Sequence, residues 1–120
     1  MEKDNSRFKF RAWYENKMHE ASGYYTDGSA RIGLSCFPYT QTVYPDSIMQ
    51  FTGLHDKNGT EIYEGDILGI ENTSFGIVDY HNERGAWILH DEDNYNELLF
   101  LQNPMPEVIG NIFEHPHLIE

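Results

Sequence analysis

Basic residues are nearly missing from the second half of this sequence. Residues 61–120 carry one of them, Arg84, against thirteen acidic side chains, whereas residues 1–60 carry seven of each sign. The net charge of −12 therefore belongs to the second half. Because nucleic-acid-binding proteins use a basic surface to neutralise phosphates, we expect no direct DNA or RNA partner. A basic protein partner, cations or solubility alone would suit this charge.

Cysteine and long apolar runs are also scarce. The one cysteine, Cys36, has no second cysteine with which to form an internal disulfide, which fits a reducing compartment. No apolar stretch is long enough to span a membrane, and the first ten residues lack the apolar run of a signal peptide. We therefore expect a soluble cytoplasmic protein with no membrane partner. Its length predicts one domain, residues 1–120, with one hydrophobic core.

Helical periodicity is confined to one short stretch, residues 95–101. Aromatic residues, with eight Tyr, seven Phe and two Trp, favour strands instead. Residues 8–14 alternate, with apolar side chains at the even positions and Lys9, Arg11 and Trp13 at the odd ones, which is typical of a half-buried strand. Further strands are predicted at residues 18–25, 31–36, 41–44, 48–52, 61–63, 67–70, 76–80, 86–90 and 108–113.

Turn residues separate these strands at regular intervals. Residues 56–59, Asp-Lys-Asn-Gly, predict a tight reversal because Asn and Gly adopt positive φ easily, and we expect positive φ at Gly59 and also at Gly53 or Gly65. Short strands at such spacing predict an all-β meander that closes into a small barrel or sandwich, with an SH3-like barrel portion over residues 64–90.

Three segments together resemble a known family. They read FKFRAW at residues 8–13, MQFTGLHDKNGTEIYEGDI at 49–67 and VIGNIFEHP at 108–116. In this order and spacing they resemble the YopX family of bacteriophage and prophage proteins. The match spans both ends and the centre of the chain, and the central segment is long and specific. His115 departs from the family pattern, in which Asn is commoner at this position.

The resemblance implies an all-β fold with an SH3-like part and an origin in a phage or prophage, hence a bacterial host cell. It implies no reaction, cofactor or catalytic residue, so no functional site is carried over from the family.

Histidines and carboxylates of the second half suggest a metal or acid–base site. His81, His90, His115 and His117 and the run at residues 91–93 are of ligand type. Their spacing matches no strong zinc or calcium template, so solvated loops are the preferred interpretation and no metal or cofactor is predicted. A small metal-dependent hydrolase that uses His81, His90 and nearby carboxylates stays open as the enzymatic alternative.

Other candidate chemistry has a simpler structural interpretation. Cys36 lacks a basic neighbour that would activate it as a nucleophile. Glu64 and Asp66 flank Gly65 and are expected to bond the backbone of a turn. The basic face formed by Lys9, Arg11 and Trp13 is too narrow for a nucleic-acid site, and is predicted to be solvated or packed on another subunit. The glycines form no phosphate-binding motif.

The acidic half is the feature that comes closest to a function. We expect its carboxylates to form a continuous negative surface that binds a basic host or phage protein, which makes the chain a non-enzymatic accessory protein. A homo-oligomeric structural phage component is the other alternative. The residues predicted to form the surface are Glu71, Asp79, Glu83, Asp91, Glu92, Asp93 and Glu97.

Overall fold

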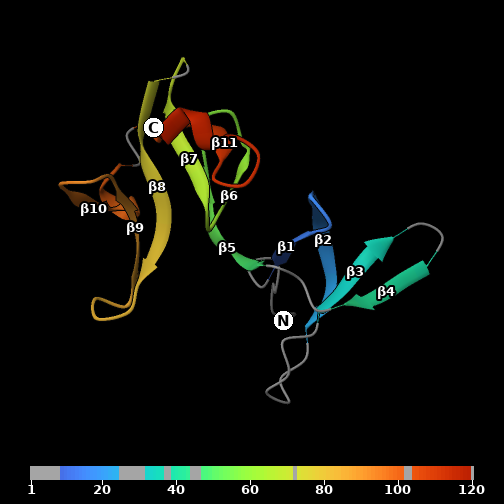
Figure 1. Cartoon of the computed structure of the whole chain (residues 1–120). Coiled ribbons are helices and arrows are strands. Elements are labelled where there is room, and N and C mark those ends of the chain that lie inside the picture. The colour runs from blue at the N-terminus through green and yellow to red at the C-terminus, as the bar shows by residue number, and fades with distance from the viewer. Residues whose placement is uncertain are drawn as a thin grey trace. The chain divides into compact units, whose positions relative to one another are not determined.

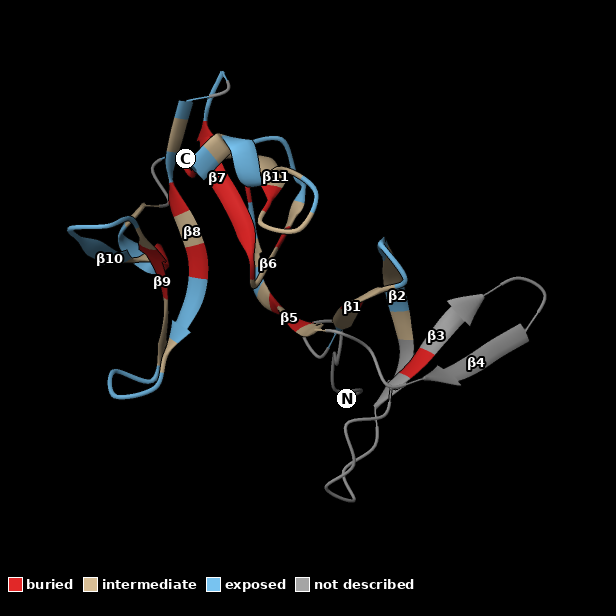
Figure 2. Ribbon diagram, in the orientation of Figure 1, coloured by how far each residue is buried: buried red, intermediate tan, exposed pale blue. Residues whose placement is uncertain are grey.

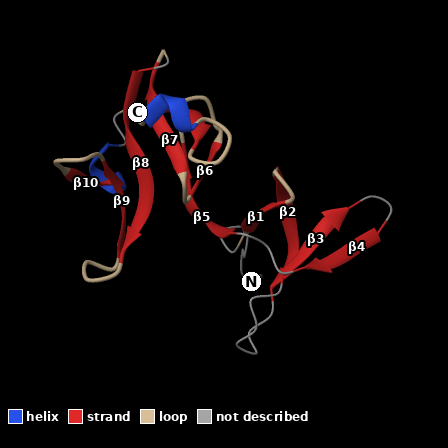
Figure 3. Cartoon of the chain, in the orientation of Figure 1, coloured by secondary structure: helices blue, strands red, loops and turns tan. Residues whose placement is uncertain are grey.

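The computed structural model describes residues 9–24, 32–36, 39–43, 47–71, 73–101 and 104–119, and the structural statements below refer to these residues. Strands dominate them, and the only helical segments are two short 3-10 helices (Figure 3). The chain divides into two compact units, Met1–Phe51 and Thr52–Glu120. Each unit has its own cluster of buried and partly buried hydrophobic side chains.

The first unit is an antiparallel sheet of order β4-β3-β2-β1-β5. Ala12, at the centre of β1, is fully buried, and Phe10, Tyr14 and Ile48 pack against it. The alternation predicted for this strand is therefore confirmed from residue 10 onward. The strands are β1 (Phe10–Tyr14), β2 (Lys17–Tyr24), β3 (Ile32–Cys36), β4 (Tyr39–Val43) and β5 (Ser47–His55), the last of which continues into the second unit.

The other face of β1 was expected to be solvated or packed on another subunit, and its Arg11 and Trp13 are half-buried. Arg11 lies directly opposite Met49 of β5, so their side chains share a face. Met49 and Phe51 are both buried, and the ammonium of Lys9 lies 5.5 Å from the centre of the Phe51 ring. Arg11 and Trp13 are thus half-buried on this face, whereas Lys9, which precedes β1, is exposed.

The second unit contains a five-stranded antiparallel sheet of order β10-β9-β8-β7-β11, which curls into a half-barrel (Figure 1). The all-β prediction is confirmed. This sheet extends beyond residues 64–90, because β10 and β11 are its two edges. Its strands are β7 (Asp66–Ile70), β8 (Thr73–His81), β9 (Ala86–His90), β10 (Tyr95–Glu97) and β11 (Glu107–Asn111), and the short strand β6 (Glu61–Tyr63) pairs with β5 instead.

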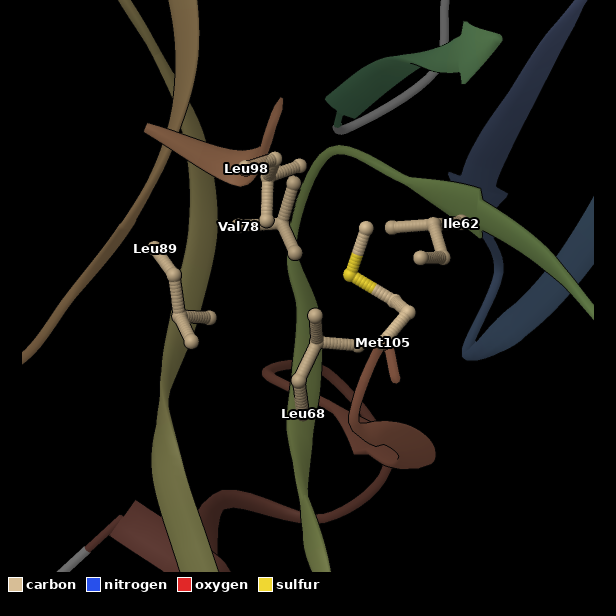
Figure 4. Close-up of a cluster of buried hydrophobic side chains, with 6 residues drawn as sticks. All are labelled: Ile62, Leu68, Val78, Leu89, Leu98 and Met105. Carbon is tan, nitrogen blue, oxygen red and sulfur yellow. The ribbon is translucent and has the colours of Figure 1, made fainter. Parts of the chain in front are cut away.

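The core of the second unit is aliphatic. Figure 4 shows its side chains, which come from β6, β7, β8, β9, the 3-10 helix Leu98–Leu101 and the segment before β11. Four consecutive residues of β7, residues 66–69, are buried, and β7 lies between β8 and the edge strand β11 (Figure 2). The cluster consists of Ile62, Leu68, Val78, Leu89, Leu98 and Met105.

The reversal at residues 56–59 joins β5 to β6, as predicted. Gly59 has a φ of 85°, and Gly53 and Gly65 have φ values of 86° and 85°. Asp56 organises the turn: its Oδ1 accepts hydrogen bonds from the backbone N–H of Asn58 and Thr60, both at 2.9 Å. Its Oδ2 accepts a third, also at 2.9 Å, from Val108 of β11. The turn is therefore attached to a strand 52 residues later in the chain.

Residues 95–101 contradict the helical prediction. Tyr95–Glu97 form β10, which pairs with β9, and only Leu98–Leu101 form a 3-10 helix, η1. Pairing with β9 supplies the backbone hydrogen bonds, and the turn at residue 98 lets Leu98 reach the core, so tertiary contacts outweigh a weak local preference. The predicted strand ends at Phe8, Tyr25, Arg31 and Tyr44 lie outside the described residues.

Candidate acidic docking surface

Polar side chains of three neighbouring strands gather on one face of the half-barrel. Asp79 of β8 lies opposite Ile88 of β9, which lies opposite Glu97 of β10. His90 lies opposite Tyr95 in the same way. Because directly opposite residues share a face, all five side chains belong to one side of the sheet. Ile88 is only 6% exposed although it lies among polar side chains on this face.

Four of the predicted acidic residues meet at an open depression on this face. Asp79 comes from β8, and Asp91, Glu92 and Asp93 come from the loop between β9 and β10. The depression has a volume of about 350 Å³, and its remaining lining residues are Ile88, His90, Asn94 and Tyr95. Within the described part of the chain, none of its lining residues is Lys or Arg. We call this feature the acidic depression.

The loop that supplies three of these carboxylates is locally ordered by Asp91. Its Oδ1 accepts hydrogen bonds from the backbone N–H of Asp93 and of Asn94, both at 2.9 Å. These two bonds, followed by the proximity of His90, lower the pKa of the Asp91 carboxyl, and its slight desolvation opposes them. Asp91 is therefore ionised at neutral pH, and the loop presents a fixed negative charge.

The single basic residue of the second half is already engaged. The guanidinium of Arg84 lies 3.3 Å from the Glu97 carboxylate and 5.6 Å from the centre of the Tyr95 ring. The hydrogen bond to Glu97 raises the pKa of Arg84, and the nearby Tyr95 and the Glu97 charge act in the same direction. Of the seven predicted surface residues, Glu97 is thus paired and does not line the acidic depression.

The structure does not bring all seven predicted residues together. Glu71 lies in the turn before β8, with a φ of 48°, and Glu83 lies in the turn after it. Because β8 has nine residues, these exposed side chains are roughly 30 Å apart. The depression gathers only Asp79 and the three residues of the loop.

An apolar pocket adjoins the acidic depression and shares three residues with it, His90, Asp91 and Glu92. It has a volume of about 470 Å³. Its other walls come from the first half of β8 and from the 3-10 helix η2 (Pro116–Ile119). These walls contribute Ser74, Phe75, Gly76, Ile77, Leu118 and Ile119.

The position of η2 depends on a polar turn that ends β11. The Asn111 Oδ1 accepts hydrogen bonds from the backbone N–H of Phe113 and Glu114, at 3.0 and 2.9 Å. The Asn111 N–H donates to Nδ1 of His115, and the His115 N–H donates back to the Asn111 carbonyl. A last bond, from the Leu118 N–H to the His115 carbonyl, starts η2, which contacts β8.

The histidines do not converge on a metal site. Nδ1 of His81 accepts the backbone N–H of Arg84 at 3.2 Å, and its ring packs beside Tyr95. Nε2 of His90 lies 3.7 Å from the Asp79 carboxylate, an ion pair only when the imidazole is protonated. His115 and His117 contact each other edge to face. Among the residues that the structure describes, no group of three His, Cys, Asp or Glu side chains is placed to hold a metal ion.

Two further residues considered as candidate catalytic groups, Asp66 and Cys36, lie at the ends of two strands. Asp66 is 1% exposed and accepts the backbone N–H of Tyr63 at 2.8 Å, so this carboxylate bonds a turn as predicted. Cys36 is the last residue of β3 and lies opposite Tyr39. None of the described helical segments is long and apolar enough to cross a membrane.

The comparison with protein families settles what the chain is related to. The model of the YopX protein family matches residues 9–120. The chain belongs to the YopX family. A search of curated proteins found no match.

The family-like segments of this YopX chain build the frame of the candidate site. The central segment contains Asp56, whose carboxylate joins the β5–β6 hairpin to β11. The last segment contains Asn111 and His115, which direct the chain into η2. The apolar pocket could not be found from the sequence, because Phe75 and Ile119 are about forty positions apart and no local pattern links them. Both side chains are exposed in the structure, Phe75 by 43% and Ile119 by 40%. Exposure is a property of the folded chain, so no signal in the sequence pointed to the pocket.

Proposed function

We propose that this YopX-family chain is a non-enzymatic accessory protein of phage or prophage origin, which acts in the cytoplasm of the bacterial host by binding a basic protein. The observation that carries this proposal is the acidic depression, at which Asp79, Asp91, Glu92 and Asp93 come together from two segments of the chain. A basic partner would neutralise these charges and would be attracted to them over a distance of about 10 Å at 0.1 M salt.

The local electrostatics support the proposal. Arg84, the single basic residue of residues 61–120, is held by Glu97. The pKa of Asp91 is lowered by hydrogen bonds from the loop backbone, so Asp91 keeps its charge. Asp91, Glu92 and Asp93 are all exposed, so a partner can reach them without displacing any of the described residues. A depression lined by charges of one sign concentrates their field, which attracts a partner of the opposite sign.

The test is charge reversal with a matched control. The triple variant Asp91→Lys, Glu92→Lys, Asp93→Lys reverses the loop. The control variant Glu15→Lys, Glu71→Lys, Glu83→Lys reverses three exposed carboxylates that do not line the depression. Both variants have the same net charge. Each is used as bait in a bacterial lysate at low and at high salt, and the recovered protein is then purified and its Kd measured.

We expect the loop variant to lose the partner and the control variant to keep it, with weaker binding by the wild type at high salt. Equal loss from both variants would mean that net charge, and not the depression, attracts basic proteins. Recovery that neither reversal nor salt changes would refute the proposal. Thermal unfolding of both variants shows whether a loss is due to unfolding.

A further inference from the structure

We infer that the apolar pocket beside the acidic depression receives one apolar side chain of the basic partner, so that the recognised segment carries a residue such as Leu or Ile next to Lys or Arg. This inference rests on the proposed function and adds to it the chemical class of the segment. It depends on the position of one pocket relative to one charged loop, both within the second unit.

The pocket has the chemistry of an anchor site. Phe75, Ile77 and Leu118 line it together with Ile119, and Phe75 and Ile119 leave about two fifths of their surface exposed. An apolar side chain that entered would remove this surface from water, at roughly 25 cal/mol per Å². A volume of about 470 Å³, open at the mouth, accepts one large aliphatic side chain together with part of its backbone.

Charge complementarity selects the kind of segment. The carboxylates of Asp91 and Glu92 border both the apolar pocket and the acidic depression. A side chain seated in the pocket would therefore place the residues next to it beside these carboxylates. Lys or Arg at those neighbouring positions would be attracted, whereas Asp or Glu would be repelled. The two features form one site that has an apolar part and an acidic part.

The two walls of the apolar pocket are held by close backbone packing on one side and by hydrogen bonds on the other. At Gly76, a Cβ atom would lie 2.6 Å from the carbonyl oxygen of His90, so β8 and β9 approach more closely there than a side chain allows. On the opposite wall, η2 is held by the hydrogen bonds between Asn111 and His115. A preformed pocket loses little entropy on binding, which favours a defined anchor over a diffuse electrostatic contact.

The experiment uses three synthetic peptides, with blocked ends, and the full chain labelled with ¹⁵N. The sequences are KKLKK, KKSKK and SSLSS, which separate the apolar anchor from the charge. Amide chemical shifts are followed during titration to obtain Kd values. We expect KKLKK to bind about fivefold or more tightly than KKSKK, with shifts at Phe75, Ile77, Leu118 and Ile119. KKSKK should shift the amides of residues 91–94 only, and SSLSS should bind more weakly than KKLKK.

Two isoleucine variants locate the effect. Ile119→Ser removes a pocket wall, and Ile70→Ser removes a similarly exposed isoleucine, 46% against 40%, that does not line the pocket. We expect the advantage of KKLKK over KKSKK to disappear in Ile119→Ser and to persist in Ile70→Ser. The affinity of KKSKK should be the same in both.

The outcomes separate the two proposals. Equal, salt-sensitive affinities for KKLKK and KKSKK would overturn the anchor pocket and leave the acidic surface supported. Affinities for KKLKK and SSLSS that are equal and insensitive to salt would show an apolar pocket without the acidic contribution and would overturn the proposed function. No binding of any peptide at millimolar concentration would overturn the anchor pocket and also remove support for the depression.

Discussion

Asp56 shows how much a single side chain contributes to this fold. It is 7% exposed and accepts three backbone hydrogen bonds, from the residues of its own turn and from β11. Burial raises the pKa of its carboxyl, but the bonds from Val108, Thr60 and Asn58 outweigh burial, so the pKa lies below its ordinary value. The family-like central segment therefore has a structural role at this position.

We expect Asp56→Ala to lower the free energy of unfolding by about 2–4 kcal/mol, because three partly buried hydrogen bonds from backbone N–H groups lose their acceptor. Asp93→Ala is the control. Its side chain is exposed, and the change should stay within about 0.5 kcal/mol. Urea denaturation of both variants measures the difference. A cost for Asp56→Ala no greater than that of Asp93→Ala would show that the carboxylate does not join the turn to β11.

The pH dependence of stability should follow from the same residue. Because the pKa of Asp56 is lower in the folded protein than in the unfolded chain, its contribution is complete above the unfolded pKa, about 4. It is lost as the pH falls from there through the folded pKa. The stability difference between wild type and Asp56→Ala should thus be constant from about pH 7 to 5 and shrink below about pH 4. A difference that stayed constant to pH 2 would contradict this.

At the scale of elements, glycines are needed at two places where a side chain would disturb the backbone. The β5–β6 turn and the β8–β9 contact both use glycine, but for different reasons. Gly59 has a φ of 85° and open space around it. Gly76 has a φ of 151° and lies against the backbone of His90. One glycine is needed for the turn and the other for the packing of two strands.

The same substitution should therefore cost different amounts at these two positions. Gly59→Ala meets only backbone strain, about 1 kcal/mol, and Gly59→Val should cost that much or more, with no loss of binding beyond it. Gly76→Ala adds a clash with the His90 carbonyl, which no rotamer relieves, and should cost clearly more than Gly59→Ala. Thermal unfolding ranks the variants, and equal Tm values for the two alanine variants would show that β8 and β9 do not approach this closely.

At the scale of the whole molecule, the uneven charge is the dominant property. Residues 61–120 carry thirteen acidic side chains and one basic one, Arg84. At neutral pH the carboxylates therefore repel one another, which opposes the compact state. The family match extends over both units, so the charged unit and the first unit belong to one family pattern. A cost in stability is the expected consequence of placing Asp79 and three further carboxylates around one depression.

Salt should consequently stabilise this protein. We expect the Tm to rise by a few degrees between about 20 and 200 mM NaCl, because the Debye length falls from roughly 20 Å to 7 Å. In the loop-reversal variant at residues 91–93 each substitution adds two positive charges, so the net charge changes from −12 to −6, and the rise should be smaller. Calorimetry at several salt concentrations measures both. An equal rise in the two proteins would place the repulsion away from the depression.

The sequence by itself determined the features that depend on near neighbours in the chain. The alternation of β1 from residue 10 onward, the reversal at residues 56–59 and the charge of the second half were all readable, because each depends on residues a few positions apart. The family was readable for a similar reason, since three segments keep their order and spacing.

Only the tertiary structure decided what lies beside what. The bond from Val108 to Asp56 spans 52 residues, and the apolar pocket combines Phe75 with Ile119. Residues 95–97 form a strand because their backbone pairs with β9. The length of β8 separated Glu71 from Glu83, and the pairing of β8 with β9 brought Asp79 to the same depression as the 91–93 loop. Such contacts depend on the geometry of distant segments, which local patterns of residue type do not carry.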